Sequence, residues 1–265
     1  MAATPGKNRT TGPAAGADLI GLLDTLYNSR NPTRRWLHRT RRDWIIGKIR
    51  ECAHLRPGRA IEVGFGAGVY LPALAEAYGE VVATDLDHAH LAHARPIAGR
   101  YRNLRLAIDD ITASAMPEHG FDLALCSEVV EHIADAPAVI AGIRRLLAPQ
   151  GFLILSTPQR HSVLELSCKV AFLPGIIRIV RALYGEAIFE TGHINLMTER
   201  EVGAALDREG FTVCERFKSG LYIPIVAEFG GAAGLRLEQW LEERLRHGRF
   251  AWTLWTQYWV ARAPG

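Results

Sequence analysis

The sequence predicts an α/β fold, with a mostly parallel sheet and helices on both of its faces. Short apolar runs recur along the chain with helical patterns between them, which is typical of successive strand–helix–strand units. A glycine-rich turn, EVGFGAGVY, follows the first of these runs. With 265 residues, 48% of them apolar, the chain is long enough for one sizeable core and too short for two full domains to be expected.

Seven strands are predicted, five of them parallel and two forming an antiparallel pair. The parallel strands are expected near residues 59–63, 81–84, 104–108, 121–126 and 152–156. The antiparallel pair is expected from two later apolar runs, at 211–217 and 252–261. Helical patterns lie between the parallel strands, at 71–79, 88–99 and 135–151, the last closing on Pro-Gln-Gly, a helix stop signal.

The turn after the first strand carries Gly64, Gly66 and Gly68, with Glu62 two residues before the first glycine. Glycine has no Cβ, so it accepts positive φ and lets a ligand approach the main chain closely. The dinucleotide fingerprint is G-x-G-x-x-G, whereas the spacing here is G-x-G-x-G. Together with the acidic Glu62, this spacing favours a ligand with a cationic amino-acid end over one with phosphates. A tight turn that binds nothing is the alternative.

Acidic residues end the second and third strands. Asp85 lies about twenty residues past the glycine turn, where a carboxylate can accept from both ribose hydroxyls. After the third strand, a carboxylate in Asp109-Asp110-Ile111 can accept from the exocyclic amine of adenine. Either acid alone would more often be a solvated turn residue, but their order after the glycine turn favours a nucleoside ligand.

With these pieces in order, the sequence resembles the class I S-adenosylmethionine-dependent methyltransferases over roughly residues 59–217. The matching motifs are EVGFGAG, TDLD, DDI, FDLALCSEVVEHI and LLAPQGFLILSTP. The resemblance implies a Rossmann-like, seven-stranded, mostly parallel sheet with helical lid insertions, and S-adenosyl-L-methionine as cofactor. It places the methionine end at Glu62, Gly64, Gly66 and Gly68, the ribose at Asp85 and Leu86, the adenine at Asp110 and Ile111, and the methyl group near Ser127 and Glu128.

The motif EVVEHI, with a histidine about sixty residues downstream, resembles a motif of the ubiquinone-biosynthesis O-methyltransferases and, more distantly, of the small-RNA terminal 2′-O-methyltransferases. In those relatives a Glu-x-x-Glu-His cluster and a further histidine can hold a divalent cation such as Mg²⁺. The resemblance makes Glu128, Glu131, His132 and His193 candidate metal ligands, and His132, His193 and Glu128 the catalytic candidates. Two alternatives remain: a histidine base without metal, or a Glu131-His132 pair that only opens a helix.

The expected organisation has five parts. They are a disordered N-terminus (1–18), a helical cap (19–57), the cofactor-binding core (58–160), a helical acceptor-binding insertion (161–200), and the rest of the core with an inserted loop and helix (201–265). The cap mixes arginines with Trp36 and Trp44, which fits a cover over the cofactor pocket with solvated arginines, or a grip on nucleic acid or an anionic membrane. The insertion is apolar between Ser162 and Gly185, and Pro174-Gly175 is expected to divide it into two helices.

These features predict O-methylation of an apolar or amphipathic small molecule, such as a quinone precursor, lipid or natural product. The alternatives are an RNA 2′-O-methyltransferase and a non-catalytic cofactor-binding protein. The formal net charge is only +3, so a nucleic-acid partner is not expected. Scattered cysteines and an N-terminus without a signal-peptide pattern favour a cytoplasmic protein, with peripheral membrane contact as an option.

Overall fold

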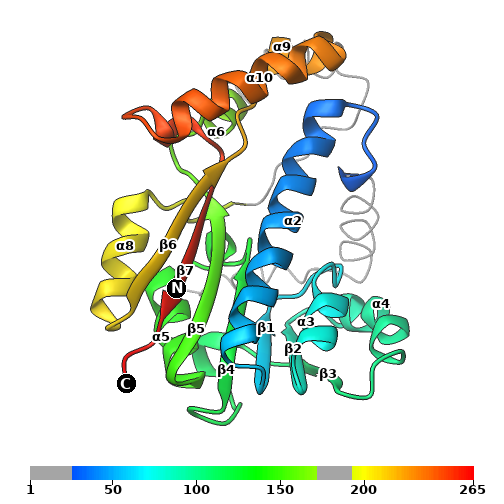
Figure 1. Ribbon diagram of the computed structural model, residues 1–265, viewed down its shortest axis with the longest axis vertical. Coiled ribbons are helices and arrows are strands. Elements are labelled where there is room, and N and C mark those ends of the chain that lie inside the picture. The colour runs from blue at the N-terminus through cyan, green and yellow to red at the C-terminus, as the bar shows by residue number, and fades with distance from the viewer. Residues whose placement is uncertain (1–25, 172–192) are drawn as a thin grey trace, which may run out of the picture.

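A seven-stranded sheet runs through the computed structural model, which describes residues 26–171 and 193–265 (Figure 1). Its strands are β1 (Arg59–Val63), β2 (Glu80–Asp85), β3 (Leu104–Ile108), β4 (Phe121–Ser127), β5 (Leu147–Pro158), β6 (Thr212–Ser219) and β7 (Thr256–Arg262). Their order is β3-β2-β1-β4-β5-β7-β6. The first five strands are parallel, and β7 pairs antiparallel with both β5 and β6. The predicted Rossmann-like fold class is confirmed.

The strand order fixes where a ligand can bind. From β1 the chain moves outward to β2 and β3, and then returns to β4 on the other side of β1. At such a switch point the connections leave in opposite directions and open a crevice beyond the carboxyl ends of the strands. The glycine turn after β1, Asp85 at the end of β2 and Ser127 at the end of β4 all lie at this edge.

Helices cover both faces of the sheet. On one face, Ile140 of α5 (Ala136–Leu146) and Val202 of α8 (Glu199–Arg208) belong to the same buried cluster as Leu153 and Trp259. The other face is covered by α2 (Pro32–Leu55), α3 (Leu71–Ala77) and α4 (His88–Ala98). Ile154, which follows Leu153, and Tyr258, which precedes Trp259, are buried on this second face. This alternation follows from the two-residue period of a strand.

Several predicted boundaries were wrong. Strand β5 begins at Leu147 rather than at residue 152, because Leu147 pairs with Phe121 before an irregularity shifts the register. Helix α5 therefore ends at Leu146 instead of running to residue 151. The strand predicted at 252–261 begins at Thr256, because Ala251–Thr253 forms a short 3-10 helix, η3. The disordered N-terminus and the break at Pro174-Gly175 lie outside the described residues, and the domain boundaries stay predictions.

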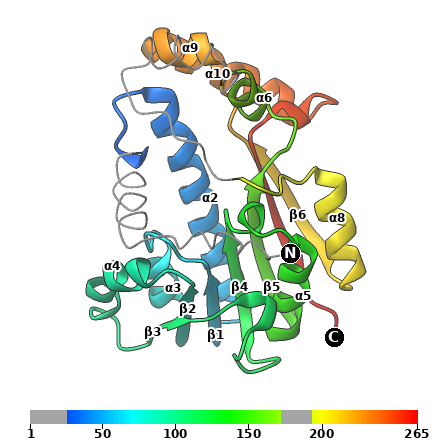
Figure 2. The same cartoon turned by 180° about the vertical axis from the view of Figure 1, so that it is seen from behind.

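Three helices gather at the end of the molecule toward which the parallel strands point (Figure 2). They are α6 (Val163–Ala171), α9 (Pro224–Phe229) and α10 (Gly231–Arg246), and the first turn of α2 reaches them. Among the described helices, none combines the length and the hydropathy needed to cross a membrane.

Two fully buried carboxylates hold α10 in place. Glu242 accepts hydrogen bonds from the backbone amides of Gly220 (2.8 Å) and Leu221 (2.9 Å) and pairs with Arg246 (2.6 Å). Glu238 accepts from the hydroxyl of Thr33 on α2 (2.6 Å). Helix α10 is therefore joined by directional bonds both to the cap helix and to the end of β6.

Replacing Glu242 by Leu is expected to destabilise the protein strongly. The substitution leaves two buried amides without their acceptor and removes one of the two carboxylates that pair with Arg246. Each unsatisfied buried donor costs about 1–3 kcal/mol, so the free energy of unfolding should fall by about 2–6 kcal/mol. The matched control is Glu243→Leu on the same helix, where the side chain is 65% exposed and a change within about 0.5 kcal/mol is expected. Urea denaturation measures both, and equal losses would contradict the anchoring role.

Candidate active site

The turn after β1 has the backbone conformation that its glycines make accessible. Gly64, Gly66 and Gly68 all have positive φ, at 68°, 51° and 73°. A Cβ on Gly64 would lie 2.6 Å from a methyl carbon of Val129, and one on Gly68 would lie 2.9 Å from a methyl carbon of Leu71. A side chain at either position would be strained by the positive φ and crowded by its neighbour, so the turn presents bare main chain at the ends of the strands.

Glu62 is a buried carboxylate without a protein partner. Its side chain lies in β1 and is 2% exposed, and Oε2 has no hydrogen-bond partner within the described part of the chain. Burial, with the nearby charge of Asp85, raises the pKa of Glu62 well above its usual range. An unpartnered buried carboxylate is costly unless a ligand compensates it. A cationic amino group is the ligand that this atom fits.

Asp85 is already organised by hydrogen bonds. Its Oδ2 accepts from the amide of Gly66 (2.9 Å) and lies 3.0 Å from Nδ1 of His90, and its Oδ1 accepts from the amide of Asp87 (2.9 Å). Burial opposes ionisation, but the bonds from His90, Asp87 and Gly66 outweigh it and lower the pKa of Asp85. The carboxylate thus ties the glycine turn to β2. Leu86 follows it with 61% of its surface exposed.

His90 is a site residue that the sequence analysis did not single out. It lies on α4, is buried, and has its pKa raised first by the hydrogen bond with Asp85. Its Nε2 atom is buried and has no partner among residues 26–171 and 193–265. The only sequence signal was its position five residues after Asp85, which places the two side chains together once α4 begins at His88.

After β3, the structure distinguishes the two adjacent acids. Asp110 is exposed, and its Oδ1 accepts from the amide (2.9 Å) and hydroxyl (2.7 Å) of Thr112. Asp109 instead has a buried Oδ2 with no partner in the described chain. The predicted adenine contact Ile111 packs its side chain into the core at 4% exposure, so only its main chain is accessible to a ligand. The orphaned oxygen of Asp109 fits the adenine amine better than Asp110 does.

At the end of β4, the cap helix enters the site. Glu128 has a positive φ of 57°, and its Oε2 forms an ion pair with Arg41 of α2. Its Oε1 accepts from Ser156 (3.0 Å), and the Ser156 hydroxyl also lies 2.9 Å from that of Ser127. Both charged side chains are largely removed from solvent, with exposed fractions of 7% for Arg41 and 20% for Glu128. The arginines of the cap were expected in solvent, and for Arg41 this expectation was wrong.

Arg41 has further neighbours from the cap and from the C-terminal part. Its Nη2 lies 3.2 Å from Nδ1 of His38, and its guanidinium lies over the ring of Trp255, 5.5 Å from the centroid. Burial, with the positive charges of Arg41 and Arg34, lowers the pKa of His38 to about 3. His38 is therefore neutral at physiological pH and can accept from Arg41.

A second group lies on the other side of Glu128. Donor atoms of Glu131, His132 and His193 all lie within 4.8 Å of one another, and the two imidazole rings are 5.4 Å apart. Glu131 is fully buried; its Oε2 accepts from Thr157 (3.0 Å), whereas Oε1 has no partner in the described residues. Burial, and next the charge of Glu128, raises the pKa of Glu131. Two imidazoles and an unsatisfied carboxylate oxygen are a donor set that fits a divalent cation.

Three of the four candidate metal ligands lie together, and the fourth does not. Glu131, His132 and His193 come together although about sixty residues separate the two histidines in the sequence. Glu128 does not join them, because Arg41 and Ser156 occupy its two oxygens.

Glu165 on α6 lies beside His193 and was not predicted. Its Oε1 accepts from the indole N–H of Trp255 (3.1 Å) and lies 3.2 Å from Nδ1 of His193. The imidazole and carboxylate are nearly buried, with exposed fractions of 10% and 9%. The two groups are close enough to pair, although Nδ1 makes no well-aligned hydrogen bond within the described residues. The apolar sequence around Glu165 gave no sign of this contact.

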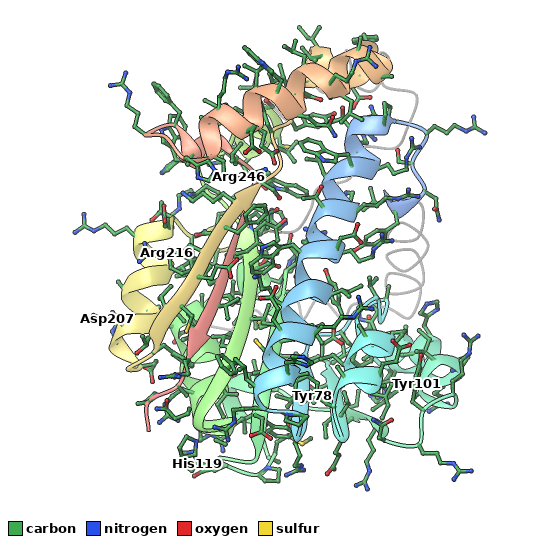
Figure 3. All side chains as sticks on the ribbon, viewed as in Figure 1. Tyr78, Tyr101, His119, Asp207, Arg216 and Arg246 are labelled. Atoms are coloured by element: carbon green, nitrogen blue, oxygen red, sulfur yellow. The ribbon has the colours of Figure 1, made fainter. Side chains whose placement is uncertain are left out.

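The hollow of about 480 Å³ bordered by Gly203, Asp207 and Arg216 lies elsewhere. Figure 3 shows Asp207 on α8 and Arg216 on β6, and β6 is an edge strand that β4, β5 and β7 separate from β1. It holds none of the orphaned carboxylates described above. We therefore base the site on the convergent side chains at the strand ends.

Comparison with known proteins identifies the family. The family model described as a methyltransferase domain matches residues 36–216, which is more than half of the chain. The ubiquinone biosynthesis O-methyltransferase of Pseudomonas aeruginosa is 34% identical over 125 residues, covering 44% of this chain and 51% of that enzyme. The enzyme of the same name from Methylococcus capsulatus is 33% identical over 105 residues, covering 38% and 44%. The matches thus span about half the length of these curated relatives.

Solved structures agree in fold at low sequence identity. The N-methyltransferase NodS from Bradyrhizobium japonicum, in complex with S-adenosyl-L-homocysteine, has a TM-score of 0.58 at 16% identity, covering 95% of this chain and 98% of that one. The [4+2]-cyclase SpnF has a TM-score of 0.55 at 16% identity, covering 84% and 80%. These likenesses show the fold alone. The family match goes further than the fold: the chain belongs to the methyltransferase-domain family.

Proposed function

We propose that the protein transfers the methyl group of S-adenosylmethionine to an oxygen of an apolar or amphipathic small molecule, such as a quinone precursor, a lipid or a natural product. The observation that carries this proposal is the group of Glu131, His132 and His193 beside the end of β4. A hydroxyl acceptor needs its proton removed or its pKa lowered, and imidazole and metal-binding side chains do this. The name of the O-methyltransferase relatives supports the same chemistry.

For the cofactor, the unpartnered groups of the site supply complementary contacts. The ammonium of the methionine end would meet the orphaned oxygen of Glu62 and the bare main chain of Gly64 and Gly66. The ribose hydroxyls would donate to Asp85, whose orientation His90 holds. The adenine would lie between Leu86 and the loop after β3, with its amine near Asp109 or Asp110. Ser127 would border the methyl group.

Catalysis then depends on alignment and on the acceptor's proton. Methyl transfer from a sulfonium is an in-line displacement, so holding the acceptor oxygen close to the methyl carbon supplies much of the rate. The cap helix excludes water from that position through the Arg41–Glu128 pair. His193, whose Nδ1 lies 3.2 Å from Oε1 of Glu165, would accept the proton.

Metal-assisted catalysis is the alternative mechanism for the same three side chains, in place of a histidine base. When bound, such an ion lowers the pKa of a hydroxyl beside it. Glu131, His132 and His193 would hold it, and Glu165 would lie beside His193. Two nitrogens and one oxygen suit zinc, manganese or iron better than Mg²⁺, which prefers oxygen ligands and retained waters.

An RNA acceptor receives less support from the cap. Among its arginines, Arg34 pairs with Glu228 (2.8 Å), Arg41 with Glu128, and Arg42 with Asp43 (2.7 Å). Cations that already pair with carboxylates are less available for the continuous basic groove that single-stranded RNA requires.

Asp85 and His90 are expected to control cofactor affinity together. Asp85→Ala removes charge-assisted hydrogen bonds worth roughly 1.5–3 kcal/mol each, so calorimetry should show S-adenosylmethionine binding weakened at least about tenfold. His90→Leu should weaken binding less, because the carboxylate remains but loses its support. His93→Leu, at an exposed histidine of the same helix, is the control and should leave the affinity unchanged. Wild-type affinity in Asp85→Ala would sink the assignment.

Glu62→Gln should stabilise the unliganded protein while weakening cofactor binding. The folded pKa of Glu62 is raised, so its ionisation opposes folding once the pH exceeds its ordinary value of about 4.3. This penalty is absent at lower pH and grows as the pH rises toward the raised pKa. The melting temperature of Glu62→Gln should therefore exceed that of the wild type more at pH 8 than at pH 5. A variant with a constant or reversed difference would show that Glu62 is satisfied within the protein.

The acceptor class is tested with methyl-tritiated S-adenosylmethionine and two substrates, a polyprenylated catechol and a single-stranded RNA with free 2′-hydroxyls. We expect label on the catechol oxygen and none on the RNA. In this assay, His193→Ala should lower the rate by roughly 10²–10⁴ if His193 is the base. A chelator should then have no effect.

If a cation is bound, a chelator should abolish turnover while S-adenosylmethionine stays bound. Each single substitution of a ligand should have the same effect: Glu131→Gln, His132→Ala and His193→Ala. Glu165→Gln should lower the rate in either case, because it removes the carboxylate beside His193. Full activity in both histidine variants, with and without chelator, would exclude both mechanisms. Label on RNA alone would replace the proposed acceptor.

A further inference from the structure

The end of the molecule formed by α6, α9 and α10 exposes most of the large apolar side chains on the described surface. Eight of the twelve exposed large apolar side chains lie on these helices or in the segment that follows α10. They are Leu166, Val170, Ile225, Phe229, Leu237, Trp240, Phe250 and Trp252, with exposed fractions between 42% and 76%. Monomeric proteins rarely collect such side chains in one region unless the region binds something.

Helix α10 distributes its charges unequally between its two sides. Its acidic residues Glu238 and Glu242 point inward and are fully buried, as described above. Four exposed residues of α10 are spaced one, three and four positions apart, which places them on the same side of the helix. They form one stripe of Arg236, Leu237, Trp240 and Arg244. The remaining acid of the helix, Glu243, is paired with Arg246 (2.7 Å). The outward side of α10 is therefore cationic and apolar.

Aromatic rings and guanidinium groups are combined on this surface. The guanidinium carbon of Arg244 lies 3.7 Å from the centroid of the Trp240 ring, and that of Arg249 lies 4.7 Å from the centroid of Phe250. Such pairs present a flat apolar ring and a positive charge side by side. We call the stripe Arg236, Leu237, Trp240 and Arg244, together with Arg249 and Phe250, the outer face.

We propose that the outer face docks on an anionic phospholipid surface. A helix with arginines and with tryptophan, phenylalanine and leucine exposed together has the composition of an interfacial helix, whose rings enter the headgroup boundary while its cations meet lipid phosphates. Nucleic acid would use the arginines and rings, but it offers nothing to Ile225, Phe229 and Leu237. The charge complementarity therefore favours lipid, and the exposed aliphatic side chains favour it further.

The position of α10 gives this docking a geometric consequence. Its buried carboxylates bond to the start of α2 and to the end of β6, and Figure 3 shows Arg246 where α10 meets β6. The parallel strands point toward the same end, so docking would turn the methyl-transfer site toward the bilayer (Figures 1 and 2). The docking itself does not depend on the proposed acceptor.

The test is flotation of the full chain with phosphatidylcholine vesicles that contain or lack phosphatidylglycerol, at low and high salt. We expect binding only to the anionic vesicles, weakened by salt. Arg236→Glu/Arg244→Glu should reduce vesicle affinity by at least about tenfold, since each arginine near an anionic surface contributes measurably. Trp240→Ser should reduce it at unchanged net charge.

Matched controls lie away from the outer face. Arg102→Glu/Arg105→Glu makes the same change in net charge on exposed residues at β3, and Leu55→Ser removes an apolar side chain that is 71% exposed at the end of α2. Both should bind vesicles like the wild type. All variants should retain wild-type S-adenosylmethionine affinity, which shows that they are folded.

Four outcomes would overturn the proposal. The first is that the wild type does not float with anionic vesicles, and the second is that the controls lose as much binding as the outer-face variants. The third is that vesicles do not bind but single-stranded RNA does, and the outer-face variants lose the RNA. The fourth is that no vesicles bind and light scattering shows a self-association that Trp240→Ser abolishes. Loss of methyl transfer with vesicle binding intact would count against the proposed acceptor instead.

Discussion

The ion pair between Arg41 and Glu128 joins the cap helix to the catalytic end of the sheet. Both partners are largely removed from solvent, so neither charge is tolerated without the other. Glu128 adopts left-handed backbone geometry at the end of β4, which a residue with a side chain holds only when its surroundings fix it. This contact therefore ties α2 to the end of β4 and, through Glu128, to Ser156 and Ser127.

The site keeps unsatisfied oxygens where ligand charge is expected. Glu62, Asp109 and Glu131 each retain a buried carboxylate oxygen without a partner in the described residues. Desolvated acids without a partner destabilise a fold, and a ligand that pairs with them would remove that cost. The same low-dielectric environment that makes these atoms unfavourable in the free protein strengthens their bonds to a cationic or amino group.

The sequence predicted the parts of this protein that depend on local pattern. The alternating strands and helices, the glycine turn and Asp85 follow from short motifs whose order sets the topology. Strand ends were less accurate, because the pairing of Leu147 with Phe121 depends on the neighbouring strand and not on hydropathy. Within the site, Arg41, Glu165 and His90 were missed as individual residues. Arg41 lies 87 residues from Glu128, and nothing local marks a surface-like arginine as the one that is buried.

The position of β7 constrains how the chain can fold during synthesis. Strand β7 lies between β5 and β6, and its Tyr258 and Trp259 are buried on opposite faces of the sheet. β6 is made earlier but has no place beside β5, so the growing chain must hold β6, α9 and α10 unassembled until β7 arrives. Until β7 pairs with it, the edge of β5 is unpaired and apolar, which is the kind of edge at which strands mispair.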